Sequence, residues 1–104
     1  MIRKAFKMRV YPDKTEAYIK RHHPIWPELQ EILKSHGVDN YSIFLDKETS
    51  ILFGYAEIES EEQWGAIALT EVCKKWWLHM STLMETNEDH SPISVELEEV
   101  FHID

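Results

Sequence analysis

The stretch AYIKRHHPIWPELQEIL, residues 17–33, gathers side chains that could carry out acid/base chemistry on a bound ligand. Tyr18 and His22 are four residues apart, so on a helix they share one face, with Arg21 beside them. An imidazole, with an unperturbed pKa of about 6.5, can donate or accept a proton near neutral pH. The spacing is compatible with a general acid at His22 and a ligand hydrogen bond from Tyr18. From spacing alone, a simpler role explains His22 somewhat better than catalysis does. It would cap the C-terminus of the helix, where a positively charged imidazolium is favoured.

The segment CKKWWLHM holds a second unusual cluster, the adjacent Trp76 and Trp77. Neighbouring residues on a helix point roughly 100° apart, so the two indoles cannot both lie in one narrow core stripe. One of them should face a ligand, a partner or solvent, and flat aromatic rings bind the C–H faces of sugars well. A pair that bridges the core and a dimer seam is an equally good interpretation. Trp26 and Trp64 are expected in the core.

Two further aromatic or basic side chains are weaker candidates. Tyr41 opens a predicted strand in phase with Ile43 and Leu45, which would put its phenol at the end of the sheet, near a pocket mouth. His23 points about 100° away from His22 around the helix and should lie on the surface. No metal is expected, because the remaining histidines are scattered without metal-ligand spacing: His36, His79, His90 and His102. With only three glycines in the chain, no nucleotide-cradling loop is expected either.

Hydrophobic periodicity and turn residues predict the elements that must position these groups. Asp13 or Thr15 could cap the first helix, Pro27 suits the first turn of the second, and Gly37 suits its end. Ser60 and Gln63 resemble a capping box. The predicted order is a strand at 4–11, a helix to about 23, a helix at 27–36, strands at 40–46 and 50–58, a helix from 61 to about 84, a loop at 85–92 and a strand at 93–103.

This β-α-α-β-β-α-β order is typical of a ferredoxin-like α+β fold, and one domain should span residues 1–104. Helices would cover one face of a four-stranded antiparallel sheet. The strand at 50–58 is apolar on both sides, which favours a sheet covered on both faces. The sequence therefore predicts a homodimer with sheets packed face to face, a dimeric α/β barrel. The two sides of that strand are Ile51, Phe53 and Tyr55 against Leu52, Ala56 and Ile58.

Composition narrows the class of ligand. The 19 acidic and 11 basic side chains give a net charge of −8, which disfavours nucleic acid and favours a small neutral ligand. Cys73 is the only cysteine, so no disulfide framework is possible within the chain. No signal-peptide core or apolar run of membrane-spanning length is present, and a cytoplasmic location is expected.

Five segments together resemble the L-rhamnose mutarotases, in the same order and over nearly the whole chain. Within them, R-H-x-P-I-W-P-E-L and W-W-x-x-M are the most specific patterns. The segments are YIKRHHPIWPELQEILKSHG, NYSIFLD, LFGYAEIESEEQW, VCKKWWLHM and SPISVELEEVFHI.

The resemblance implies a homodimeric α/β barrel that interconverts the α and β anomers of L-rhamnose without a metal or organic cofactor. The catalytic proton donor of the family falls on His22. Its sugar contacts fall on Tyr18, Tyr41 and the paired Trp76 and Trp77. All five residue types are retained, which reverses the preference for a simple helix cap at His22.

Departures from the family are small. A loop that often reads N-P-D-N-S-P in the family is NEDHSP here, with Glu88 and His90 as the differing residues. His23 also stands where related sequences often carry a smaller polar residue. If the loop closes over the sugar, these changes bear on substrate preference and not on the proton donor.

The same fold also hosts non-catalytic small-molecule binders and cofactor-free monooxygenases, so a second class of function stays open. A binder would hold its ligand without accelerating anomer exchange. A monooxygenase would consume oxygen with an aromatic or polyketide substrate.

Overall fold

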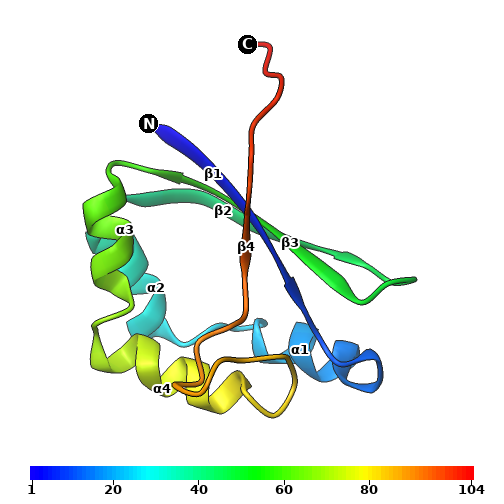
Figure 1. Ribbon diagram of the computed structural model, residues 1–104. Helices are drawn as coiled ribbons and strands as arrows, with labels where there is room; N and C mark the ends of the chain where they lie inside the picture. The colour runs from blue at the N-terminus through cyan, green and yellow to red at the C-terminus, as the bar shows by residue number, and fades with distance from the viewer.

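The structure, a computed structural model, describes residues 1–104 as a four-stranded sheet flanked by helices (Figure 1). In spatial order the strands are β2-β3-β1-β4, and every neighbouring pair is antiparallel. The strands are β1 (Ile2–Arg9), β2 (Val38–Asp46), β3 (Ile51–Ile58) and β4 (Val95–Leu97). The helices are the 3₁₀ turn η1 (Pro12–Lys14), α1 (Thr15–Arg21), α2 (Pro27–Ser35), α3 (Glu61–Ile67) and α4 (Glu71–Met80).

This topology confirms the predicted ferredoxin-like fold. The strands alternate between two faces because successive side chains of a strand point to opposite sides. One face, the helix face, packs against the helices through the hydrophobic core, to which β1 contributes Phe6 and Met8. The other, the open face, carries no helix and exposes Phe44 (64%) and Phe53 (37%). The sheet is therefore apolar on both sides, as the sequence predicted.

The first two helices begin and end close to their predicted positions. Pro27 occupies the first turn of α2, and Gly37 follows its end with a φ of +76°, as predicted. The predicted cap of α1 was wrong, because neither Asp13 nor Thr15 caps it. The helix instead continues from the 3₁₀ turn, with Lys14 at the N-cap position and no side-chain hydrogen bond.

The prediction of one continuous helix from 61 to about 84 was also wrong, since the chain breaks into α3 and α4. Thr70 explains the break: its hydroxyl donates to the Ile67 carbonyl at 2.7 Å and accepts from the Cys73 amide at 3.3 Å. One side chain thus closes α3 and caps α4. The predicted cap of α3 is confirmed, because the Ser60 hydroxyl accepts from the Gln63 amide at 3.1 Å.

The predicted last strand, 93–103, was too long. Only Val95–Leu97 pair with β1, and residues 98–104 extend away from the body to the C-terminus (Figure 1). The apolar side of the predicted strand lies over the open face, where nothing in a single chain covers it. We call residues 98–104 the C-terminal tail. Its apolar side chains Val100, Phe101 and Ile103 are largely exposed.

No helix combines the length and apolar character needed to cross a membrane. The loop predicted at 85–92 is confirmed. It is held by Asn87, whose amide donates to the Ser91 hydroxyl at 3.0 Å.

Candidate functional site

The last turns of α1 bring Tyr18 and His22 together, as their spacing predicted. Their ring centroids lie 4.6 Å apart. His22 is the C-cap residue of α1, so the simple capping role and a place beside Tyr18 are both realised. His23 points away and is exposed, with its Nδ1 2.8 Å from the Ile19 carbonyl oxygen.

The orientation of the His22 ring is set by the backbone of its own helix. Nδ1 lies 2.8 Å from the Tyr18 carbonyl oxygen, which can only accept, so Nδ1 carries a hydrogen and donates. Proton exchange is therefore left to Nε2. Burial lowers the pKa of His22, and the hydrogen bond to Tyr18 opposes part of that shift. At neutral pH most of His22 is neutral, with a lone pair on Nε2.

An aromatic cluster on α4 and the α1–α2 connection forms a wall beside His22. Trp76 is buried (8% exposed) and meets the His22 ring edge-on, with centroids 5.3 Å apart. Trp26 packs against Trp76 at 5.1 Å, and the His79 ring lies 5.3 Å from Trp26. Arg21 Nη1 donates to the His79 carbonyl, joining the end of α1 to the last turn of α4. Local sequence spacing links His22 to Tyr18 but gives no sign of these contacts.

A second aromatic group lies on the helix face of the sheet. Tyr41 is in phase with Ile43, as predicted, and its ring lies 6.2 Å from Phe6 and 6.0 Å from Trp64. The Phe6 ring covers Gly54, where a Cβ would approach its atoms to 2.5 Å. Glycine at that position thus allows Phe6 to support Tyr41. Sequence reasoning missed Phe6, because an ordinary core residue at strand spacing gives no other signal.

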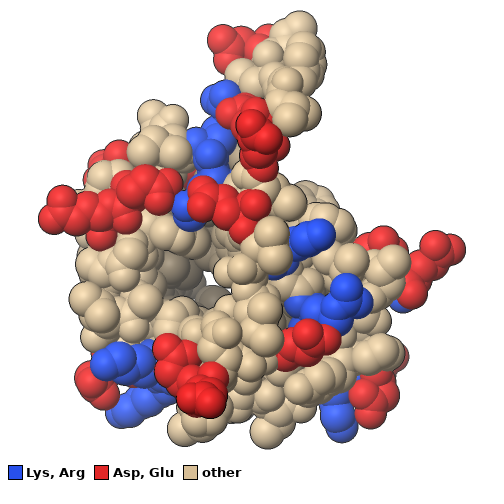
Figure 2. Space-filling view, in the orientation of Figure 1, with Lys and Arg blue, Asp and Glu red and all other residues tan.

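The two aromatic groups approach each other through Tyr18 and Tyr41, whose phenols interact. Figure 2 shows a hollow on this side of the molecule, opening between β4 and helices α2, α3 and α4. Tyr41 is 37% exposed, yet surrounding protein raises the pKa of its phenol, a combination expected of a concave wall. Burial also raises the pKa of Tyr18, with a smaller contribution from the nearby Tyr41. Both phenols therefore stay protonated at neutral pH and can donate hydrogen bonds.

Several polar atoms of these residues have no hydrogen-bond partner within the chain. Where such an atom belongs to a partly or fully buried residue, it still has surface exposed to solvent, so it can reach water or a ligand. Such atoms, set among aromatic rings, can fix the hydroxyl groups of a small polar ligand. They are Tyr18 Oη, His22 Nε2, Tyr41 Oη, Trp76 Nε1 and Trp77 Nε1.

The structure brings Tyr18, His22, Tyr41 and Trp76 into one neighbourhood, whereas the Trp77 ring packs against none of their rings. Trp77 is half-buried and packs against both hydrophobic clusters of the core. The two indoles diverge as predicted. No group of three or more His, Cys, Asp or Glu side chains is arranged to hold a metal ion.

Known proteins resemble this chain over its full length. A family model described as L-rhamnose mutarotase matches residues 3–103. A protein named L-rhamnose mutarotase from Pectobacterium carotovorum subsp. carotovorum (strain PC1) is 59% identical over 104 residues, covering 100% of both chains.

Solved structures agree with that similarity. The crystal structure of an L-rhamnose mutarotase from Formosa agariphila superposes with a TM-score of 0.92 at 42% identity, covering 100% of both chains. A putative antibiotic biosynthesis monooxygenase from Nitrosomonas europaea gives a TM-score of 0.65 over 97% of this chain and 100% of that one. Its 15% identity shows a shared fold alone.

Proposed function

The chain belongs to the L-rhamnose mutarotase family, and from this premise we propose that it interconverts the α and β anomers of L-rhamnose. The reaction opens the pyranose ring to the aldehyde, rotates one bond and closes the ring on the other face. One observation supports this chemistry above the others: the His22 ring is held through Nδ1, while Nε2 has no hydrogen-bond partner within the chain and is not sealed from solvent. An imidazole fixed in this way can exchange a proton with a bound sugar.

In the proposed mechanism, protonated His22 donates the proton on Nε2 to the ring oxygen as the C1–O5 bond breaks. The proton of the anomeric hydroxyl leaves at the same time, and C1 becomes the aldehyde carbon. Neutral His22 then takes the proton back from the C5 hydroxyl when that oxygen attacks the other face of C1, and the base returns the anomeric proton to the former aldehyde oxygen, which becomes the hydroxyl of the other anomer. A well-placed acid/base group contributes about 10²- to 10⁴-fold, so no covalent intermediate is required. The base that receives the anomeric proton stays unassigned.

The proposed sugar contacts divide between hydroxyl donors and an apolar wall. Tyr18 and Tyr41 stay protonated because burial raises the pKa of each phenol, and both can hydrogen-bond sugar hydroxyls. Trp76 offers an indole edge and Nε1 beside His22. Trp77 is retained as the second wall residue on the strength of the family pattern. A neutral deoxy sugar suits these aromatic surfaces.

Saturation-transfer NMR between the two anomeric proton signals of L-rhamnose tests the proposal. The wild-type protein should accelerate exchange over the uncatalysed reaction, and His22→Ala should lose the acceleration. His23→Ala is the matched control, because His23 makes the same 2.8 Å contact to the carbonyl four residues earlier but is exposed. Binding without acceleration by the wild type would instead indicate a binding module. Full activity in His22→Ala would contradict the assigned role.

We also propose that the protein is a homodimer that packs open face to open face. Phe44 and Phe53 are paired across β2 and β3 on that face and are exposed there. The C-terminal tail adds further apolar surface and bounds a groove of 310 Å³ with Arg3, Tyr55 and its own Phe101. Exposed apolar surface of this kind marks an association site.

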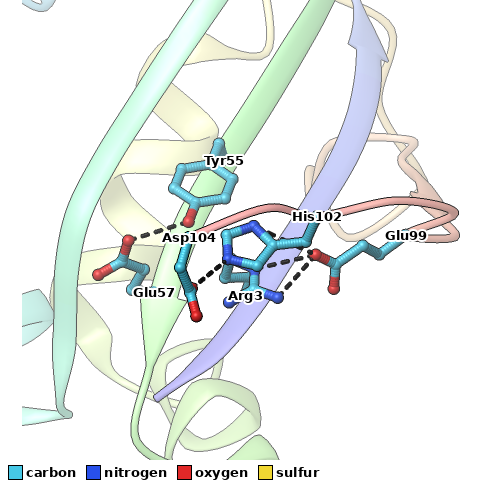
Figure 3. Close-up of polar contacts among 6 residues, drawn as sticks. All are labelled: Arg3, Tyr55, Glu57, Glu99, His102 and Asp104. Carbon is cyan, nitrogen blue, oxygen red and sulfur yellow. Dashed lines mark hydrogen bonds and ion pairs between the residues drawn. The ribbon is translucent and has the colours of Figure 1, made fainter.

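The polar contacts of the tail leave its apolar side chains free. Figure 3 shows Glu99 paired with Arg3 at 2.8 Å, and His102 beside Asp104 at 2.9 Å. Sedimentation velocity should therefore give a dimer for the wild type and a monomer for Phe44→Asp, which places a charge among the exposed apolar side chains of the open face. A wild-type monomer at micromolar concentration would contradict the dimer.

A cytoplasmic location remains a proposal, supported by the single cysteine. Cys73 is a free, buried thiol, and burial raises its pKa to about 11. It therefore stays protonated and takes no part in the proposed chemistry.

A further inference from the structure

Strand β2 contains an irregularity immediately before Tyr41. Asp39 pairs with Glu57 and Ser42 pairs with Tyr55, so two residues of β2, Asn40 and Tyr41, stand opposite a single residue of β3. This is a β-bulge, which inserts one extra residue and re-aims the side chains that follow.

The bulge determines the face on which Tyr41 lies. Val38 and Tyr41 are three positions apart, so in a regular strand they would point to opposite faces. Here Val38 is buried with Ile58 on the helix face, and Tyr41 packs against Phe6 on the same face. A regular strand that kept Val38 in the core would place the Tyr41 phenol on the open face, away from His22.

Side chains on the opposite face of the sheet hold the bulge. Asn40 has a φ of +47°, a conformation that asparagine tolerates better than most residues. The side-chain amide nitrogen of Asn40, Nδ2, donates to Glu57 Oε1 at 2.9 Å. The Tyr55 hydroxyl donates to Glu57 Oε2, also at 2.9 Å, and Figure 3 shows that contact. Glu57 therefore joins the extra residue of β2 to β3 through both carboxylate oxygens.

We propose that Asn40 and Glu57 are positioning residues for the sugar site, acting through the bulge to aim Tyr41 into the hollow. The inference rests on the proposed mutarotase function. Neither residue touches the sugar, because both side chains lie on the open face. Their contribution is to exclude the regular pairing that would withdraw Tyr41 from the site.

This role predicts a specific kinetic signature. We call the hydrogen-bonded Asn40, Glu57 and Tyr55 side chains the bulge clamp. Tyr41 holds a sugar hydroxyl, whereas His22 moves the proton and caps α1, which makes no hydrogen bond to the clamp. Loosening the clamp should raise KM about tenfold, the effect of weakening one hydrogen bond to the substrate, and change kcat less than about threefold. The pH dependence set by His22 should not change.

The test uses two variants that remove the clamp and one that preserves it. Glu57→Ala removes both contacts of the carboxylate. Asn40→Gly removes the amide while a glycine still accepts the positive φ, so the backbone itself is not strained. Glu57→Gln keeps the shape and can still accept from Asn40, and it should restore KM to within about threefold of the wild-type value.

Glu99→Ala is the matched control. It removes a carboxylate that the C-terminal tail places beside the open face, and with it the Arg3 ion pair, but leaves the contacts of Asn40 and Glu57 intact. It should leave KM unchanged, which separates the clamp from any general effect on the open face or on a dimer.

Each outcome is decisive for one of the two hypotheses. An inactive wild type would overturn the proposed function itself. An active wild type with unchanged KM in both Glu57→Ala and Asn40→Gly would overturn the clamp. Equal losses in Glu57→Ala and Glu99→Ala, matched by equal losses of melting temperature, would also overturn it, because they would indicate a structural role alone.

Discussion

Raising the pH from 7 to 8 should sharply lower the rate of catalysed anomer exchange if His22 is the proton donor. Nδ1 donates to the Tyr18 carbonyl in both protonation states, so only Nε2 titrates. The imidazolium form is the donor, and burial lowers the pKa of His22 below its ordinary value of 6.5. A bound sugar would displace water from the hollow and lower the pKa further.

The size of the fall in rate follows from the upper limit of 6.5 on the pKa of His22. With any pKa at or below 6.5, the protonated fraction falls about 8- to 10-fold between pH 7 and pH 8. The rate should fall by the same factor. It should rise as the pH is lowered from 7, and level off only below the shifted pKa.

Saturation-transfer NMR at saturating L-rhamnose measures this dependence after the uncatalysed exchange at each pH is subtracted. Circular dichroism at each pH verifies that the protein stays folded. The slope should be absent in the residual activity of His22→Ala. A rate that is constant or increases from pH 7 to pH 8 would refute the donor role. It would indicate that neutral His22 begins the reaction as a base.

Substitutions of Gly54 and Arg21, each with a control, test two contacts that support the site. Gly54→Ala should cost about 1–3 kcal/mol of stability and raise KM, because the new Cβ would lie 2.5 Å from the Phe6 ring. Gly65→Ala has open space around its Cβ and should stabilise α3 by up to about 1 kcal/mol, so equal melting temperatures for the two variants would contradict the argument. Arg21→Met breaks the bond to the His79 carbonyl and should lower kcat/KM roughly tenfold, as expected for a small displacement of catalytic groups. Arg21→Lys should recover most of that loss, and steady-state anomer exchange that is unaffected in Arg21→Met would refute the link.

The sequence was informative wherever structure depends on local periodicity and turn chemistry. The spacing of Tyr18 and His22 fixes their shared face, because 3.6 residues complete each helical turn. Pro27 and Gly37 mark the helix ends for equally local reasons. Five segments spread over nearly the whole chain were also enough to predict the family to which the chain belongs.

Other features depended on contacts that local patterns do not describe. The break between α3 and α4 comes from the two hydrogen bonds of Thr70, and threonine, although a weak helix former, does not by itself end a helix. The predicted strand began at residue 40, whereas β2 begins at Val38, and in a regular strand Val38 and Tyr41 would lie on opposite faces. Only the bulge, held from β3 by Glu57, reconciles the two.

The assembly of the site itself was decided by tertiary structure. Residue types and spacing named the candidate groups on α1, β2 and α4, segments separated by dozens of residues. Their meeting around one hollow depends on the register of β2 against β3 and on the packing of Trp76 against His22. The lowered pKa of His22 follows from that packing, because desolvation depends on every atom that surrounds the ring and not on its neighbours in sequence.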